Sequence, residues 1–456
     1  MADSESPAPE SQNDVRPIHP DVKSARRRAF LGANAGHAIE FYDYGVYGFL
    51  AAYMAANFFP STDPVAGLLA SFAVFALSFF IRPLGGLVFG PMADKVGRKK
   101  TLLTVLLMMS GSTFLIGLLP TYHQIGVLAP VLLVLARLIQ GLSAGGEVGT
   151  ATAFVVEYSG PKRRGYSVSW LMLTAVLGFL VGSATSNGLA NVLGDESMSQ
   201  WGWRIPFLLA GPLGAIAIYI RLKLEDSPVF RALESSGDIE ESPIRAASRM
   251  PRVLMLTFAS IVMHASIFYL VSSYLGVHLR TVMNFDSGMV LWVSVGSLFY
   301  AALLMPIFGH LSDLVDRRNL LLAASIAGCI TMPAFFLLSP GASNPVFFLY
   351  LWAVVTNFGL FSSSVNALLA DLIPARIRAT VVAFSFNTPI ALFGGTTPLI
   401  ATWLTDVTGD VTSPAWYFLG TALVTTVALL VIKKRDFIQE PAVLGNIVKA
   451  EHRLTS

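Results

Sequence analysis

Charged residues are scarce in this sequence. They make up 13% of its 456 residues, whereas hydrophobic residues make up 54%. An ordinary soluble domain carries about 25% charged residues, so the composition excludes that class and indicates an integral membrane protein. The net charge of +3 is too small to indicate a nucleic-acid partner, and in a membrane protein it mostly reflects the loops. We therefore expect the lipid bilayer to be a partner and nucleic acid not to be one.

Cysteine is nearly absent too. The single Cys329 excludes an intramolecular disulfide framework and offers no cluster for metal ligation. The sequence also lacks a nucleophile–base arrangement, metal-ligand spacing, a phosphate-binding glycine loop and a soluble domain large enough for signalling. These absences disfavour a membrane enzyme or a receptor. We expect no metal, no cofactor and no catalytic residues.

Long apolar segments dominate the chain. A membrane-spanning helix needs about 17–25 apolar residues, and twelve segments meet this length: 30–58, 65–92, 102–120, 126–157, 166–192, 204–222, 252–280, 287–311, 319–339, 345–370, 380–404 and 414–432. The longest polar interruption lies near the middle. The expected division is a disordered tail at 1–27, a six-helix bundle at 28–222, a linker at 223–251, a second bundle at 252–433 and a tail at 434–456.

The basic residues predict the orientation. Lys and Arg are in excess in cytoplasmic loops. The two tails and the connections after the even-numbered helices hold 27 of the 31 basic residues. Both termini and the linker are therefore expected in the cytoplasm.

The two halves of the chain repeat each other. "GPMADKVGRKK" from Gly90 resembles "GHLSDLVDRRN" from Gly309, and "EYSGPKRRGY" from Glu157 resembles "DLIPARIRAT" from Asp371. Two echoes in the same order indicate a duplicated six-helix unit. Parallel repeats of this kind place a substrate site between the halves, near the midplane of the membrane.

These residues carry a family resemblance. "GPMADKVGRK" resembles the signature loop of the major facilitator superfamily. Further segments, "AIEFYDYGVYGF", "IRPLGGLVFG", "RLIQGLSAGGEVG", "WGWRIPF" and "FGGTTPLIATWL", resemble the metabolite:proton symporters within it. The resemblance implies an all-α membrane protein with twelve transmembrane helices in two pseudo-symmetric six-helix bundles. It implies a carrier of proline, glycine betaine, α-ketoglutarate, citrate or shikimate. "GVYGF" favours the proline/betaine branch, whereas the arginine of "ARLIQG" is more typical of the organic-acid branch.

The first helix contains two acids in an apolar setting. Helical spacing places Glu40 and Asp43 on one stripe with Tyr44 and Tyr47, and His37 lies one turn before Glu40. A carboxylate in hydrocarbon is costly unless it is paired, hydrated or protonated. We therefore expect one of the two acids to take up and release a proton during transport, with His37 a candidate relay. The alternative is a permanent ion pair or a cap, and the sequence leaves open which acid couples.

The fourth helix carries a second polar stripe. Arg137 and Glu147 are separated by about 15 Å along a helix, so each needs a partner on another helix. Arg137, next to Gln140, is expected to bind a carboxylate, either of the substrate or of the first helix, because a guanidinium suits bidentate contact. Glu147 is either a second proton site or a structural residue. Arg82 is expected to form a structural pair with a carboxylate.

Other polar and aromatic residues complete the predicted sites. The candidates for substrate binding are Tyr44, Tyr47, Arg137, Gln140, Trp170, His264, Tyr269, Asn357 and Asn387. The gating candidates, at the cytoplasmic helix ends, are Gly90, Asp94, Gly97, Arg98, Lys99, Glu157, Asp313, Arg317 and Asp371. We expect Asp94 to contact a helix terminus of the other half and Arg98 to bond Glu157. Being at an interface, these residues are expected to be partly solvated.

The function expected from the sequence is import of a small zwitterionic or anionic metabolite together with a proton, by alternating access. An exporter of the same fold, driven by proton antiport, is the alternative, and a channel fits the duplicated halves less well. The expected location is the inner membrane of a bacterial cell. We expect the working form to be a monomer.

Overall fold

The computed structural model describes residues 22–60, 64–340 and 343–438. Within them the chain is helical, with turns between the helices and no strand. The first group of spanning helices comprises α1 (Val22–Phe58), α2 (Pro64–Phe80) continued by α3 (Arg82–Val96), α4 (Arg98–Leu118), α6 (Leu128–Ser159), α7 (Arg164–Ser197) and α8 (Arg204–Leu222). The short α5 (Tyr122–Ile125) lies between α4 and α6.

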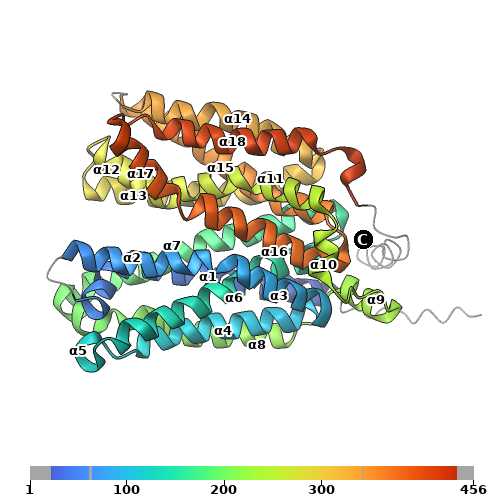
Figure 1. The fold of residues 1–456 in the computed structure, drawn as a ribbon, viewed down its shortest axis with the longest axis horizontal. Helices are drawn as coiled ribbons and strands as arrows, with labels where there is room; N and C mark the ends of the chain where they lie inside the picture. The colour runs from blue at the N-terminus through green and yellow to red at the C-terminus, as the bar shows by residue number, and fades with distance from the viewer. Residues whose placement is uncertain (1–21, 61–63, 341–342, 439–456) are drawn as a thin grey trace, which may run out of the picture.

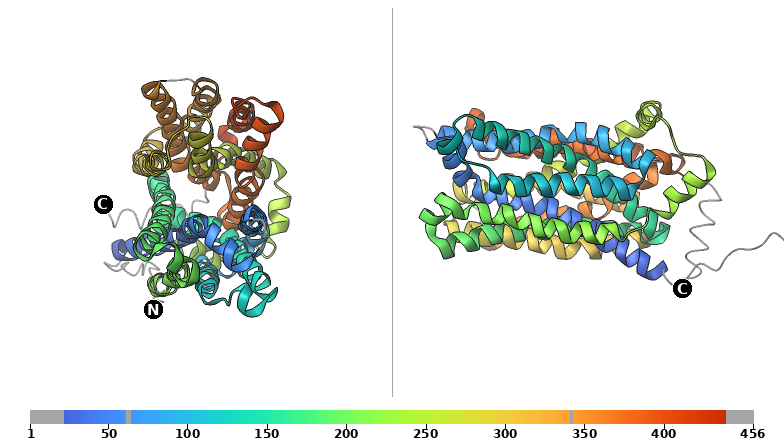
Figure 2. Two further views of the ribbon diagram at one scale, coloured as in Figure 1. Left: turned by 90° about the vertical axis from the view of Figure 1, so that its left-hand side faces the viewer. Right: turned by 90° about the horizontal axis from the view of Figure 1, so that it is seen from below.

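The second group of spanning helices repeats the arrangement of the first. It comprises α11 (Pro251–Tyr269) continued by α12 (Leu275–Thr281), α13 (Ser287–Leu314), α14 (Arg317–Leu338), α15 (Asn344–Leu372), α16 (Arg378–Pro389) continued by α17 (Thr397–Thr408), and α18 (Pro414–Val431). The axes of the long helices are nearly parallel to one another (Figure 1), and the two groups lie against each other along their length (Figure 2). Helices α7 and α13, and helices α3 and α16, pack across the boundary.

Eleven helical stretches of the described residues are long and apolar enough to cross a membrane. Twelve spans were predicted, and α1 is the one that does not reach this apolarity. It lies where the first span was expected, and its acids and its other polar residues lower its hydropathy. Large apolar side chains are exposed on the outside of the helices, as for Leu107, Met255 and Leu399. The chain is a multi-pass integral membrane protein.

Irregular turns interrupt three spans of the structure beside a central cavity. A π-helical turn, η3 (Leu270–Tyr274), joins α11 to α12, and a second, η5 (Ile390–Gly394), joins α16 to α17. Between α2 and α3 the helix is interrupted at Ile81, before Pro83. An interrupted helix leaves backbone polar groups without their usual hydrogen bonds. Inside a membrane this is tolerated only where protein or a cavity surrounds the interruption. All three lie beside residues that line a central cavity.

The ends and the linker differ in detail from the prediction. Helix α1 begins at Val22, so residues 22–27 are helical, contrary to the predicted disorder; residues 1–21 lie outside the described part. The linker contains two short helices, α9 (Pro228–Ser236) and α10 (Pro243–Ser248), each with proline at its first position, where proline fits a helix start. Of the C-terminal tail only residues up to 438 are described, with a 3-10 turn at Lys434–Asp436.

Candidate functional site

A cavity lies between the two groups of helices. Its wall is mostly apolar and aromatic, with a few polar groups, as in ligand pockets generally. The polar side chains are Arg82 from the first group and His264, Tyr269 and Ser362 from the second. His264 Nδ1 lies 3.1 Å from the Ser362 hydroxyl. The cavity therefore brings one permanent cation from one half opposite neutral hydrogen-bonding groups of the other.

Arg82 is bound to a carboxylate of α1. Its Nη2 atom donates to Glu40 Oε1 at 2.5 Å, and both side chains are almost fully buried. The Tyr44 hydroxyl lies 3.4 Å from the same oxygen. The other oxygen, Oε2, lies 3.5 Å from His37 Nδ1 and has no hydrogen bond among the described residues. Glu40 thus keeps one unused acceptor atom next to a cavity-lining arginine.

Asp43 is more completely satisfied. Arg137 Nη1 donates to Asp43 Oδ2 at 2.6 Å, and Gln140 Nε2 donates to Oδ1 at 3.1 Å. The guanidinium of Arg137 lies 3.9 Å from the centre of the Tyr47 ring, a cation–π contact. Arg137 is fully buried and does not line the cavity. This pair accordingly joins α1 to α6 and uses both Asp43 oxygens, while Arg137 Nε and Nη2 have no hydrogen-bond partner among the described residues.

The third buried pair has a partner that the sequence did not suggest. Arg221, in the last turn of α8, donates to both oxygens of Glu147, at 2.5 and 3.3 Å, and to the carbonyls of Gly32 and Leu102. The count of basic residues had included Arg221 in the connection after the sixth expected helix. The sequence feature that could have indicated this position is Gly36. A Cβ atom at residue 36 would lie 1.8 Å from Arg221 Nη2, so only glycine leaves room for the guanidinium.

Most of the residues predicted to bind substrate lie outside the wall of this cavity. Asn357 and Asn387 donate to backbone carbonyls, and Asn387 thereby joins α16 to Gly145 of α6. Trp170 packs edge-on against Phe30 and Tyr166. The predicted residues that do not line the cavity are Tyr44, Tyr47, Arg137, Gln140, Trp170, Asn357 and Asn387, whereas His264 and Tyr269 do.

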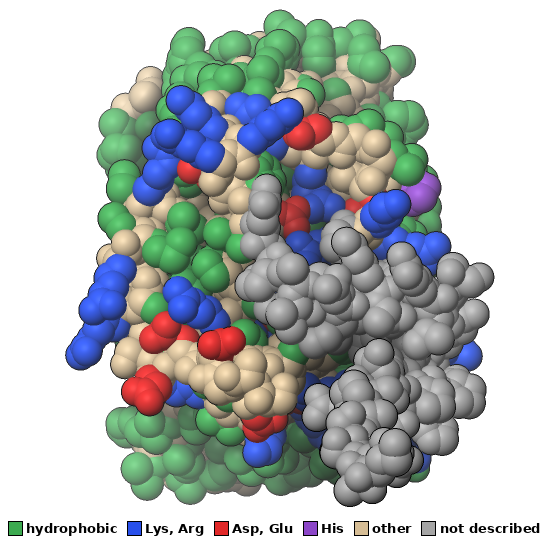
Figure 3. Space-filling view, turned by 90° about the vertical axis from the view of Figure 1, so that its right-hand side faces the viewer, with side chains coloured by type: hydrophobic (Ala, Val, Ile, Leu, Met, Phe, Trp, Pro, Cys, Tyr) green, Lys and Arg blue, Asp and Glu red, His purple; other side chains and the backbone are tan. Residues whose placement is uncertain are grey.

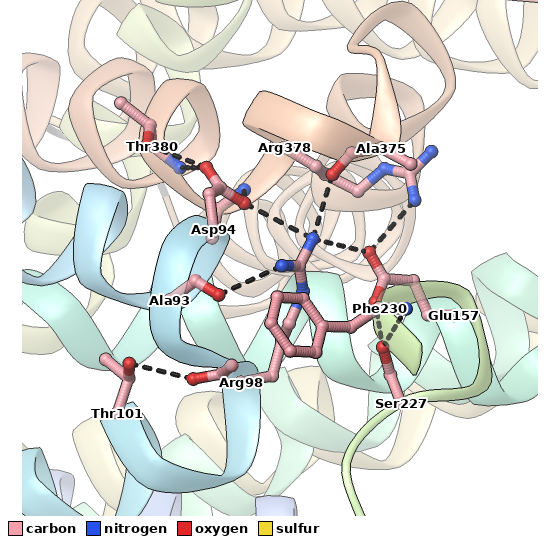
Figure 4. Close-up of polar contacts among 12 residues, drawn as sticks. Ala93, Asp94, Arg98, Thr101, Glu157, Ser227, Phe230, Ala375, Arg378 and Thr380 are labelled. Carbon is pink, nitrogen blue, oxygen red and sulfur yellow. Dashed lines mark hydrogen bonds and ion pairs between the residues drawn. The ribbon is translucent and has the colours of Figure 1, made fainter. Parts of the chain in front are cut away.

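The predicted gating residues meet at the face where the linker lies. Asp94, near the end of α3, accepts from the backbone N–H groups of Ala379 and Thr380 at 3.2 and 2.9 Å and from the Thr380 hydroxyl at 2.7 Å. These donors form the first turn of α16, where the helix dipole favours an anion. Figure 4 shows this contact between the two halves. Asp94 thus lies at a helix terminus of the other half, as the spacing predicted.

Arg98 holds the same junction by several bonds. Its guanidinium lies 3.2 Å from both Asp94 and Glu157 and donates to the carbonyl of Ala375 at 2.8 Å. Glu157 also accepts from Arg378 at 3.2 Å and from the Ser227 hydroxyl of the linker. The Phe230 ring of α9 covers the guanidinium at 5.0 Å (Figure 4). The linker is therefore part of this junction.

A second junction repeats the first with the halves exchanged. Asp313 of α13 accepts from the backbone N–H groups of Gly165 and Tyr166 in the first turn of α7, both at 2.8 Å. Arg317 contacts Asp313 at 2.8 Å and also pairs with Asp371. Asp371 in turn contacts Arg164 at 2.7 Å. We call the two sets together the paired gate, after the role that the sequence predicts for them.

The side chains of the paired gate are less exposed to solvent than predicted. Asp94, Arg98 and Glu157 are at most 4% exposed, so partial solvation is wrong for the first set; the side chains of Arg317 and Asp371 are 10% and 17% exposed. Burial follows from close backbone approach, because a Cβ at Gly90 would lie 2.7 Å from Thr380 Cα. Lys99 instead donates to the Leu222 carbonyl of its own half.

Comparison with known sequences decides the family. The sequence model described as Major Facilitator Superfamily matches residues 34–388 and 292–447. The chain belongs to the major facilitator superfamily. A proline/betaine transporter of Salmonella typhimurium is 35% identical over 425 residues, which cover 90% of this chain and 83% of that protein. The glycine betaine/proline/ectoine/pipecolic acid transporter OusA of Dickeya dadantii is 34% identical over 424 residues, with the same coverage.

A solved structure agrees at the level of the fold. The proton:xylose symporter XylE superposes with a TM-score of 0.71, covering 89% of this chain and 95% of XylE, at 15% sequence identity. Membership of this superfamily makes the protein a transporter and not an enzyme. The two groups of helices described above correspond to the major facilitator fold.

Proposed function

We propose that this major facilitator protein imports a small zwitterionic compatible solute, of the proline or betaine type, together with a proton. Support for the solute class comes from relatives at 34–35% identity that are proline and betaine transporters. Such solutes carry a carboxylate, and the cavity offers one guanidinium to bind it. We further propose that both termini lie in the cytoplasm, that the bilayer is the inner membrane of a bacterial cell, and that the working unit is a monomer.

The observation that carries the coupling mechanism is the Arg82–Glu40 pair at the cavity wall. A substrate carboxylate that binds Arg82 competes with Glu40 for the same guanidinium. Glu40 would then be a buried charge without its partner, which costs several kcal/mol. Protonation at its unused Oε2 atom removes that charge. Substrate and proton therefore favour each other's binding, as symport requires.

The other two buried pairs support this assignment by contrast. Asp43 has both oxygens bonded, and Glu147 is held by a bidentate contact to Arg221. Neither arginine of these pairs lines the cavity. We propose that they stabilise the first bundle through the whole transport cycle, while Arg82–Glu40 opens and closes.

Alternating access follows from the paired gate. With Asp94 and Asp313 bonded across the boundary, the face carrying the linker is closed. Opening to that side must break both contacts together with the Arg98 and Arg317 bridges. A two-state rearrangement of this kind needs only a few kcal/mol of differential binding.

The test is charge movement in proteoliposomes on a solid-supported membrane, with proline, glycine betaine, α-ketoglutarate and shikimate at several pH values. We expect a pH-dependent current with the zwitterions. Arg82→Lys should weaken substrate binding about 10- to 100-fold, because the bidentate contact is lost.

Glu40→Gln tests the proposed proton coupling, and Asp43→Asn, which neutralises the other acid of α1, is its matched control. We expect Glu40→Gln to abolish the proton-driven current but to keep substrate exchange, whereas Asp43→Asn should lower thermal stability and keep a pH-dependent current in the folded fraction. Uphill, proton-driven accumulation by Glu40→Gln would contradict the assignment.

A further inference from the structure

A second pocket opens where the linker meets the second bundle. It is formed by α10 with its flanking residues and by the 3-10 turn η4 (Ala375–Ile377). Its wall consists of Glu240, Ser242, Arg245, Ala246, Arg249, Met250, Arg376 and Ile377. It lies on the face of the paired gate and shares no residue with the wall of the central cavity. Figure 3 shows this face, with Lys and Arg side chains gathered among a few acidic ones.

Three of the lining residues are arginines that have no partner in the part of the chain that the structure describes. Arg245, Arg249 and Arg376 are exposed. Among the described residues, none of their side chains makes a hydrogen bond or ion pair; the ion pairs of this region involve other residues. One acid, Glu240, lies in the wall, and its carboxylate accepts from the Ser242 backbone N–H. The pocket therefore carries an excess of about two positive charges.

We propose that this pocket binds a phosphate group. Guanidinium groups present forked donors that match phosphate oxygens, and several of them around one concavity neutralise a multiply charged anion. Ser242 contributes a further polar side chain to the wall. The phosphate has two possible sources: the head group of an anionic phospholipid, for which basic pockets beside transmembrane helices are suited, or a soluble phosphate compound.

The pocket lies next to the paired gate, so a ligand bound in it affects the gate. Arg376 follows Ala375, whose carbonyl accepts from Arg98, and it precedes the α16 turn that binds Asp94. Helix α10 packs against α3 of the first bundle and against η4, α11 and α16 of the second. A phosphate held between α10 and η4 thus fixes the linker on the second bundle beside the closed gate. Binding stabilises the closed state of this face.

The first experiment measures binding directly, by calorimetry on the full chain in a neutral detergent, with pyrophosphate and inorganic phosphate as probes. The test variant carries Arg245→Gln, Arg249→Gln and Arg376→Gln. The control variant carries Lys162→Gln, Arg163→Gln and Arg231→Gln, which removes the same charge from exposed positions outside the pocket. We expect saturable binding that the test variant weakens at least about tenfold and the control variant keeps.

A second arm identifies the source of the phosphate. The protein is reconstituted in phosphatidylcholine vesicles with increasing phosphatidylglycerol, and its thermal stability is measured. A stabilisation by phosphatidylglycerol that requires the three arginines assigns the site to a lipid head group. Pocket-dependent binding of pyrophosphate with no such lipid dependence assigns it to a soluble phosphate compound.

The proposal is overturned if the test and control variants bind both probes and respond to lipid equally, or if neither probe nor phosphatidylglycerol acts through the pocket. These readouts do not involve substrate transport. Failure of the proposed solute or of proton coupling would therefore leave this result unchanged, and the reverse also holds.

Discussion

At the scale of single residues, a linker carboxylate replaces a missing helix cap. Gly97 precedes α4 with φ +112°, a conformation that favours glycine, and so it has no side chain to cap the helix. In the second repeat the corresponding Asp316 caps α14 itself, accepting from the Asn319 N–H at 2.9 Å. In the first repeat Asp226 supplies this carboxylate, accepting from the N–H groups of Arg98 and Lys99 at 3.0 and 3.3 Å. Asp226 thereby ties the linker to the gate.

Asp226 gives a prediction on pH dependence. Burial raises the pKa of its carboxyl above the ordinary value, because desolvation disfavours the charged form. The folded state therefore binds this proton more tightly than the unfolded state, and stability falls as pH rises from the ordinary pKa through the raised one. Asp226→Asn removes this titration, so its unfolding temperature should fall less across that window. Scanning fluorimetry in detergent measures it, with Glu241→Gln, an exposed acid elsewhere in the linker, as control. Identical pH profiles for wild type and Asp226→Asn would contradict the assignment.

At the scale of elements, the gate depends on how closely helices approach. Helix α3 reaches α16 only because residue 90 lacks a side chain, and α13 reaches α7 in the same way at Gly309, where a Cβ would lie 2.5 Å from Ser169 Oγ. Gly90→Val should therefore separate α3 from α16, weaken the Asp94 contact and shift the protein towards a state open on the linker side.

The separation is measurable as a distance. Spin labels at Lys100→Cys and Arg376→Cys, in a Cys329→Ser background, report the gap between the bundles by pulsed electron resonance. We expect a longer mean distance in Gly90→Val. Gly188→Val is the matched control, because nothing lies within 4 Å of a Cβ at that helical position. An unchanged distance in Gly90→Val would show that the close approach does not hold the gate.

At the scale of the whole molecule, the internal repeat explains why so much could be predicted. The helical class, the membrane location and the contact of Asp94 with the other half follow from apolar run lengths and from the echo at Gly90 and Gly309. For the partners inside the membrane the sequence offered only a choice of helices, as for Arg137 and the acids of the first helix, because which arginine meets which acid depends on the depth and rotation of each helix. Arg82 and Arg221 lie on different helices, and no spacing links them to Glu40 and Glu147. The contact of Asp226 with the start of α4 could not be predicted either, because no spacing in the sequence links the linker to that helix.

The orientation proposed from the basic residues is testable for the whole molecule. In intact cells and a Cys329→Ser background, a membrane-impermeant maleimide should label Val192→Cys, which is 82% exposed at the end opposite the gate. It should not label Lys162→Cys, on the face of the gate, until the membrane is permeabilised. The reverse pattern would place the gate and the linker outside the cell.

The way in which the paired gate is bonded also bears on how the two halves diverged. Asp94 and Asp313 accept from main-chain N–H groups, which every residue except proline provides. The donors are Ala379 and Thr380 in one copy and Gly165 and Tyr166 in the other, and these pairs share no residue. After the duplication, the sequences opposite the two aspartates could change without losing these main-chain bonds, to which the Thr380 hydroxyl adds one side-chain donor for Asp94. A genetic screen for suppressors of Asp94→Asn should accordingly find no charge exchange at positions 379 and 380, because no side-chain charge there was part of the bond.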